Sequence, residues 1–127
     1  MPTKIVDASA AVALLFHEDG SRAVALALED AALAAPELLP FEVASACLKK
    51  LRRHPAIRGG LIAAFGILPS LGIRLMPVDQ SAALLLAEKT SLSVYDASYL
   101  WLAQILGAEL VTLDRRLERA YAAARRG

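Results

Sequence analysis

The feature that most constrains the fold of this chain is the alternation of short apolar segments with longer helical ones. Ile5-Val6 is apolar and β-branched, and it ends at Asp7-Ala8-Ser9 before an alanine-rich segment that runs to Phe16. Strands are predicted at 5–6, 32–35, 73–78 and 109–113, and helices at 10–16, 22–30, 40–54, 81–90, 94–106 and 115–125, with a further helical stretch after His54-Pro55 that is broken by its glycines and Pro69.

Strands that alternate with helices require crossover connections, which join parallel neighbours in a sheet. We therefore predict an α/β sandwich around a mostly parallel sheet of four or five strands. Of the 127 residues, 57% are hydrophobic, which is enough apolar material for one buried core in a chain too short for two. A single domain over residues 1–127 is expected.

Composition argues against several other classes of protein. The longest nearly uncharged stretch, residues 59–73, is interrupted by Gly66, Pro69 and Gly72, so no membrane-spanning helix is predicted. The N-terminus has no apolar run ending in a small-residue cleavage site, which favours a cytoplasmic protein. The single cysteine, Cys47, excludes an internal disulfide and a cysteine-based zinc site, and we expect it to be a buried helix residue.

The charges are unevenly distributed along the chain. Residues 1–48 carry two basic and seven acidic side chains, a net charge of −5, whereas residues 49–127 carry twelve basic and six acidic ones, a net charge of +6. This asymmetry permits an anionic partner without requiring one.

Four acidic residues stand at the starts of predicted helices. Asp7 and Asp114 each lie where a strand is followed by a helix, on the rim where ligands bind in open α/β sheets. Glu42 and Asp96 lie in the first turns of two further helices. Acidic side chains also cap free N–H groups and complement the helix dipole, so each of the four, taken alone, is better explained as a cap.

Two hydroxyl neighbours and four short motifs favour a shared site. Ser9 follows Asp7 by two residues and Thr112 precedes Asp114 by two, so each of these acids has a hydroxyl able to orient it. The motifs are Ile-Val-Asp7-Ala-Ser9, Pro40-Phe-Glu42-Val-Ala-Ser-Ala, Tyr95-Asp96-Ala-Ser-Tyr-Leu-Trp-Leu-Ala and Leu-Val-Thr112-Leu-Asp114-Arg-Arg-Leu. In order and separation they resemble the motifs of PIN-domain ribonucleases, especially the VapC-type toxins of toxin–antitoxin pairs. The resemblance covers nearly the whole chain, with one departure: family members often carry Asn where this chain has Ser45.

The resemblance implies a PIN-like three-layer α/β/α sandwich and an endoribonuclease that hydrolyses RNA phosphodiester bonds with a metal-activated water. Hard oxygen ligands with no Cys or His nearby favour Mg²⁺ or Mn²⁺ over zinc. The implied partners are RNA, a small antitoxin protein and a second copy of the chain in a homodimer. By resemblance, the metal ligands and catalytic acids are Asp7, Glu42, Asp96 and Asp114, with Ser9 and Thr112 in supporting positions.

An RNA substrate at an acidic cavity requires positive charge at the cavity margins. Arg115 and Arg116 are the preferred RNA-binding candidates because they adjoin Asp114. The basic run at 49–53 is a second candidate, with a solvated helix face as an equally good explanation. Aromatic residues could stack on bases, although their helical spacing favours the core or an interface; they are Tyr95, Tyr99 and Trp101.

Three other functions compete with this one. A phosphoacceptor receiver domain would carry adjacent acids after the first strand and a lysine after the last, whereas Asp7 precedes Ala8 and Asp114 precedes Arg115. A haloacid-dehalogenase-like phosphatase would carry a second Asp where this chain has Ser9. A PIN-like protein that only binds RNA or protein stays open, although the presence of all four acids counts against it.

Overall fold

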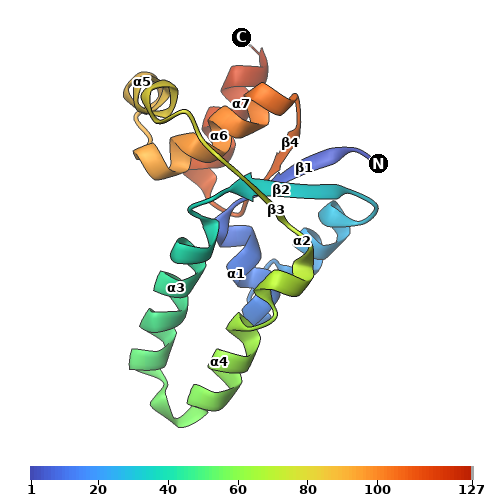
Figure 1. Ribbon diagram of the computed structural model, residues 1–127, viewed down its shortest axis with the longest axis vertical. Coiled ribbons are helices and arrows are strands. Elements are labelled where there is room, and N and C mark those ends of the chain that lie inside the picture. Colours follow the sequence, from blue (N-terminus) through green and yellow to red (C-terminus); the bar gives the residue numbers. More distant parts are fainter. Residues whose placement is uncertain (127) are drawn as a thin grey trace.

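The computed structural model describes residues 1–126 and contains a four-stranded sheet with helices on both faces (Figure 1). All strand pairs are parallel, in the order β3-β2-β1-β4, which confirms the predicted α/β fold. The elements are β1 (Thr3–Val6), α1 (Ala8–Phe16), α2 (Ser21–Leu28), β2 (Ala32–Pro36), α3 (Leu39–Arg53), the 3₁₀ helix η1 (Pro55–Ile57), α4 (Arg58–Phe65), the 3₁₀ helix η2 (Leu68–Leu71), β3 (Arg74–Met76), α5 (Gln80–Thr90), α6 (Val94–Leu106), β4 (Glu109–Val111) and α7 (Arg115–Arg126).

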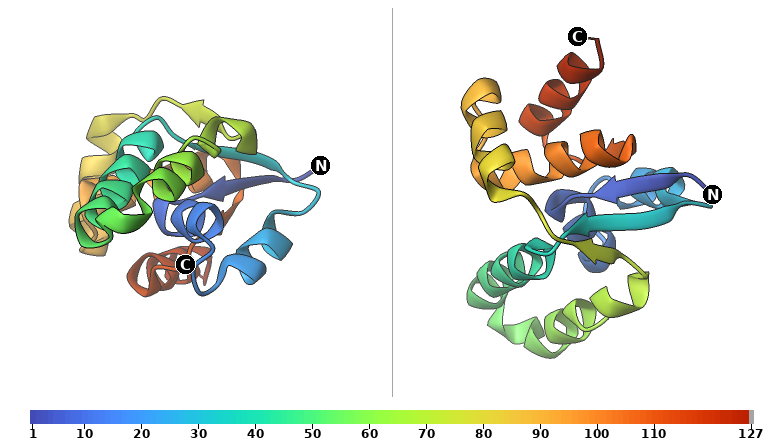
Figure 2. Two further views of the ribbon diagram at one scale, coloured as in Figure 1. Left: turned by 90° about the horizontal axis from the view of Figure 1, so that it is seen from below. Right: turned by 45° about the horizontal axis from the view of Figure 1, so that its top comes forward.

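The helices form two layers around the sheet. Helices α5, α6 and α7 lie on one side, whereas α1, α3 and α4 lie on the other, with α2 packed beside α1 (Figures 1 and 2). Helices α3 and α4 extend away from the sheet and form the lower end of the molecule in Figure 1. Within residues 1–126, no helix is long and apolar enough to cross a membrane.

The core forms where α6 packs across the sheet. Strand β1 is central and covered on both faces, which is why Ile5 and Val6 are both fully buried instead of alternating. Helix α6 adds Tyr99, Leu100 and Leu102 to the same cluster. The helix begins at Val94, as predicted, because the Ser93 side chain accepts a hydrogen bond from the Asp96 N–H.

Several predicted boundaries were wrong, each for a local reason. The strand predicted at 73–78 is only Arg74–Met76, because Pro77 has no N–H for the ladder. The strand predicted at 109–113 ends at Val111, since the Leu113 N–H is bonded to the Ser9 hydroxyl instead. The helix predicted at 22–30 is Ser21–Leu28, and it follows an N-cap at Gly20, whose φ of 90° favours glycine. Cys47 is buried in α3, as expected.

The topology determines which side chains meet at the sheet edge. All four strands point the same way, so their carboxyl ends share one edge. Strand β1 lies between β2 and β4, and the connections that follow β1 and β4 run to opposite faces of the sheet. This arrangement leaves a crevice at the carboxyl edge beside Asp7.

Candidate functional site

Asp7 lies at the centre of the edge formed by the carboxyl ends of the strands. It directly follows β1, where Val6 pairs with Val111 of β4, and its N–H donates to the Val111 carbonyl at 3.3 Å. Its side chain is the N-cap of α1 and accepts from the Ala10 N–H at 2.9 Å. Asp7 is only 4% exposed, so the sequence places a carboxylate inside the protein at the start of a helix.

Two hydroxyl groups hold the Asp7 carboxylate in one orientation. Ser9 lies 2.8 Å from Oδ1 and Thr112 lies 2.5 Å from Oδ2. The Ser9 oxygen accepts from the Leu113 N–H at 2.9 Å, and the Thr112 oxygen accepts from the Asp114 N–H at 3.0 Å. Because each hydroxyl oxygen already accepts a backbone N–H, each hydroxyl can donate its own proton to the Asp7 carboxylate. Ser9 and Thr112 therefore tie Asp7 to the loop that follows β4.

This network predicts a loss of stability when the Thr112 hydroxyl is removed. We expect Thr112→Val to lower the free energy of unfolding by about 1–3 kcal/mol, because a buried carboxylate loses a donor and the Asp114 N–H loses its acceptor. Thr112→Ser keeps the hydroxyl and is the matched control. Urea denaturation of the two variants measures the difference, and equal stabilities would show that the hydroxyl bonds do not contribute.

Asp114 and Asp96 reach the same edge from two helices on the other layer. Asp114 Oδ1 accepts from the Leu117 N–H at 2.9 Å, so this acid also caps a helix, α7. Asp96 lies in the first turn of α6, but its carboxylate accepts no hydrogen bond from any residue between 1 and 126, because Ser93 caps the helix. Helix capping therefore explains Asp7 and Asp114 and leaves Asp96 unexplained.

Glu42 is held by Tyr99, which the sequence offered only as a core or interface residue or a possible base-stacking residue. It lies in the first turn of α3, and its Oε1 accepts a hydrogen bond of 2.6 Å from the Tyr99 hydroxyl. Tyr99 is 1% exposed and comes from α6, across the sheet edge from α3. It cannot stack on a base from this position. Its spacing of three residues from Asp96, which puts both on one face of α6, was the signal available in the sequence.

The four acids influence one another electrostatically. Burial is the main cause that raises the pKa of Asp7, of Glu42 and of Asp96 above the usual range. Repulsion adds to this effect: Asp114 raises the pKa of Asp7 and of Asp96, whereas Asp96 and Asp7 raise the pKa of Glu42. The fold therefore places each of the four acids within range of the charge of at least one other.

The donor set of this edge fits a hard divalent cation. It offers carboxylate and hydroxyl oxygens, which Mg²⁺ and Mn²⁺ prefer, and a cation would offset the repulsion that raises these pKa values. Among residues 1–126, no three acidic, histidine or cysteine side chains already stand in a metal-binding arrangement. The residues that could hold a cation are Asp7, Glu42, Asp96 and Asp114, supported by Ser9 and Thr112.

The basic and aromatic residues proposed to bind RNA differ in exposure and in distance from the acids. Arg116 is close enough to Asp96 to lower the pKa of that acid, whereas Arg115 is an exposed residue of α7 that contributes to none of the raised pKa values. Tyr95 is 65% exposed, and Trp101 packs partly buried against the core. Of the three aromatic residues, Tyr95 alone presents most of its surface to solvent.

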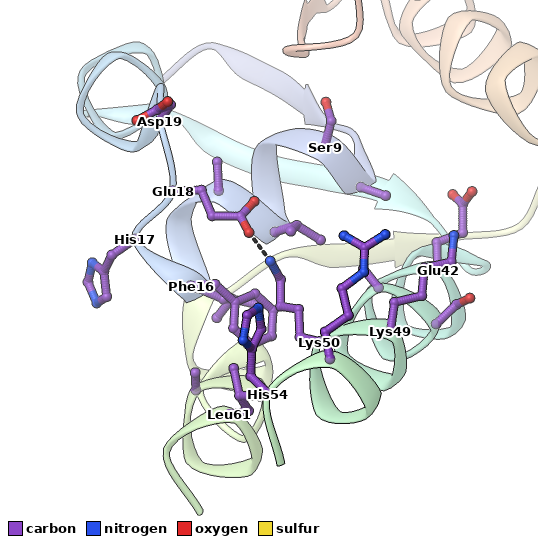
Figure 3. Close-up of a pocket in the computed structure, with 18 of the residues that line it drawn as sticks. Ser9, Phe16, His17, Glu18, Asp19, Glu42, Lys49, Lys50, His54 and Leu61 are labelled. Atoms are coloured by element: carbon purple, nitrogen blue, oxygen red, sulfur yellow. Dashed lines mark hydrogen bonds and ion pairs between the residues drawn. The ribbon is translucent and has the colours of Figure 1, made fainter. Parts of the chain in front are cut away.

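A groove of about 960 Å³ leads away from the acids between α1, α3 and α4. Ser9, Glu42 and Leu113 line the end at the acids, and α3 forms one wall (Figure 3). Ser45, the one departure from the resembled motifs, is exposed in this wall. The acidic edge is therefore open to a long ligand.

Comparisons with known proteins find relatives of nearly the whole chain. The model of the PIN domain matches residues 4–123. The chain is 34% identical over 127 residues to ribonuclease VapC3 of Pyrobaculum aerophilum, covering 94% of this chain and 95% of that protein. It is also 34% identical over 113 residues to ribonuclease VapC9 of Mycobacterium tuberculosis, covering 89% and 87%. Among solved structures, it is similar to PAE2754 from Pyrobaculum aerophilum, with a TM-score of 0.76 and 27% identity over 94% of this chain and 84% of that one.

Proposed function

Because this chain belongs to the PIN-domain family, as its four motifs predicted, we propose that it is a Mg²⁺- or Mn²⁺-dependent endoribonuclease that hydrolyses RNA phosphodiester bonds. The observation that carries the proposal is the buried Asp7 carboxylate at the carboxyl edge of a parallel sheet, where Ser9 and Thr112 hold it. The other three acids reach the same edge, where repulsion among the charges of the four raises pKa values. Its relatives named as ribonucleases align over most of this chain, which supports the same activity. The metal ligands and catalytic acids proposed are Asp7, Glu42, Asp96 and Asp114.

Each proposed ligand has a distinct structural role in this chain. Ser9 and Thr112 hold Asp7 in place, and Tyr99 holds Oε1 of Glu42 and leaves the second oxygen of that carboxylate free to bind. Asp96 accepts no hydrogen bond from residues 1–126, so both of its carboxylate oxygens are available to bind. When bound, Mg²⁺ or Mn²⁺ supplies charge stabilisation at the scissile phosphate and lowers the pKa of a water for in-line attack.

Arg116 is the better supported of the two arginines proposed to bind RNA. Its guanidinium lies near enough to Asp96 to lower the pKa of that acid, so it is placed to meet a phosphate beside the site. Arg115 stands next to it in the first turn of α7 and remains part of the proposal as an exposed, more distant contact.

We also propose that the protein is the toxin of a toxin–antitoxin pair. Support comes from its relatives named VapC, with which it shares 34% identity. On this proposal a small antitoxin protein binds it, it forms a homodimer, and it acts on RNA in the cytoplasm. Co-purification with the product of the adjacent gene, followed by inhibition of cleavage, tests the pairing.

Removing the metal tests the proposed reaction. We expect the purified protein to cleave single-stranded or transfer RNA with Mg²⁺ or Mn²⁺, to lose cleavage in excess chelator, and to recover it when the cation returns. A denaturing gel with a 5′-labelled RNA measures this. Cleavage that persists in chelator would exclude the metal mechanism. RNA binding without cleavage under any metal condition would favour the inactive binding module instead.

A further inference from the structure

We propose that the groove between α1, α3 and α4 holds the RNA strand that leads away from the cleaved bond, with Lys49 and Arg53 contacting its phosphates. The inference rests on the proposed ribonuclease function and goes beyond it, because it assigns a binding path and the residues along it. Of the basic residues in the run at 49–53, it selects two.

The groove is continuous with the acidic edge. Glu42 and Ser9 belong both to the candidate site and to the groove lining, so a strand whose phosphate reaches these acids enters the groove directly. Figure 3 shows Glu42 and Lys49 on the wall formed by α3. The volume of about 960 Å³ is large enough for several nucleotides.

The wall residues recur at helical spacing. Glu42, Lys49 and Arg53 are separated by seven and then four residues, which places all three on one face of α3. At the rise of an α-helix, Lys49 lies roughly 10 Å along the axis from Glu42, and Arg53 a further 6 Å or so. One turn of helix is a step comparable to that between successive phosphates of an extended strand. Arg52, on a different face of α3, does not line the groove.

The charges of Lys49 and Arg53 are free to meet an anion. Lys50 forms an ion pair with Glu18 and lies 5.2 Å from the centre of the Phe16 ring, so its charge ties α3 to the end of α1 (Figure 3). Within residues 1–126, Lys49 and Arg53 form no ion pair. The remaining unpaired acid in the lining apart from Glu42 is Asp19, which lies on the far side from α3 in Figure 3.

The parts of the lining that come from α1 and α4 are mostly apolar and suit bases and riboses. They include Val12 of α1 and Leu61 of α4. A protein segment could also occupy a groove that has both basic and apolar parts. RNA is favoured because the basic residues are aligned with the proposed catalytic Glu42, where a phosphate must lie during cleavage.

Two double variants, called the groove pair and the control pair, test the proposed path. Lys49→Ala with Arg53→Ala removes both charges from the groove, whereas Arg52→Ala with Arg58→Ala removes two charges from exposed positions outside it. Both pairs are made in an Asp96→Asn background to prevent cleavage. The binding of a fluorescein-labelled 12-nucleotide single-stranded RNA is measured by anisotropy across a salt titration, with circular dichroism as the check on folding.

We expect the groove pair to weaken RNA binding at least tenfold at low salt. Each phosphate contact to a single strand contributes about 0.7 to the slope of log K against log salt. Losing two contacts should therefore reduce the magnitude of that slope by about 1.4. The control pair should change affinity less than threefold and leave the slope unchanged. Equal effects of the two pairs, or undiminished binding by the groove pair, would overturn the inference and leave the groove to a protein partner.

This design separates the inference from the proposed function. If the wild-type protein cleaves RNA and the groove pair binds it normally, the groove path is wrong and the ribonuclease proposal stands. If no cleavage occurs under any metal condition but the groove pair loses binding, the groove still binds RNA through Lys49 and Arg53, and only the ribonuclease proposal fails. An absence of RNA binding by the parent protein would overturn the path as well.

Discussion

Asp96→Asn is expected to reduce kcat/KM for RNA cleavage on the order of a thousandfold, because several kilocalories per mole of metal-dependent stabilisation are lost and each 1.4 kcal/mol is tenfold. Its carboxylate makes no hydrogen bond or ion pair within residues 1–126, so asparagine of the same shape breaks no such contact. The initial rate of cleavage of a labelled RNA in Mn²⁺ measures the effect. Undiminished cleavage would exclude Asp96 from the proposed site.

The direction in which Asp96→Asn changes the stability of the folded chain follows from the raised pKa of Asp96. Burial and the charge of Asp114 raise the pKa of Asp96 above 3.8, so its charged form is less favourable in the folded chain than in the unfolded one. The stability linked to this group is therefore present at low pH and lost as the pH rises through the folded pKa. Without metal at pH 7, Asp96→Asn should unfold at the same or a higher urea concentration than wild type. Relative to Asp96→Asn, wild type should therefore gain stability as the pH falls through the folded pKa of Asp96.

Asp7→Asn tests the same site less cleanly. Asp7 accepts from Ser9, Thr112 and the Ala10 N–H, and an amide in its place would point an N–H group at one of these donors. We expect this variant to lose both cleavage and stability, because a buried hydrogen-bond network is broken. Asp96 is therefore the more informative position, a distinction that the order of motifs does not reveal.

Tyr99→Phe is expected to weaken Mn²⁺ binding and cleavage by about 10- to 100-fold, the usual cost of removing a group that orients a metal ligand. The substitution removes only the hydroxyl that donates to Glu42 at 2.6 Å and leaves the buried ring in the core. Tyr99 is a positioning residue, since it acts through Glu42. Isothermal titration with Mn²⁺ measures the affinity without requiring catalysis.

Tyr95→Phe is the matched control for this experiment. Tyr95 lies one turn earlier on α6 and is 65% exposed, and its hydroxyl forms no hydrogen bond to the described residues. We expect its Mn²⁺ affinity to equal that of wild type. An unchanged affinity in Tyr99→Phe, with the fold intact by circular dichroism, would mean that the contact with Glu42 does not organise the site.

Local sequence patterns predicted the elements well where short-range physics controls them. Asp7 after an apolar strand, Ser93 before an apolar helix and Gly107 after it each mark a helix boundary through their own backbone and side-chain preferences. Strand ends were harder to predict. Val111 ends β4 because the next N–H groups bond to Ser9 and Thr112, and the partner Ser9 is more than a hundred residues away.

By itself, the sequence determined that four acids stand at helix starts, that two of them follow strands, and which family their order resembles. Only the tertiary structure decided how they are held: Tyr99 bonds to Glu42 across 57 residues, and Thr112 bonds to Asp7 across 105. The physical reason is that capping and periodicity act within a few residues, whereas these contacts depend on the parallel sheet that brings α3, α6 and the end of β4 to one edge.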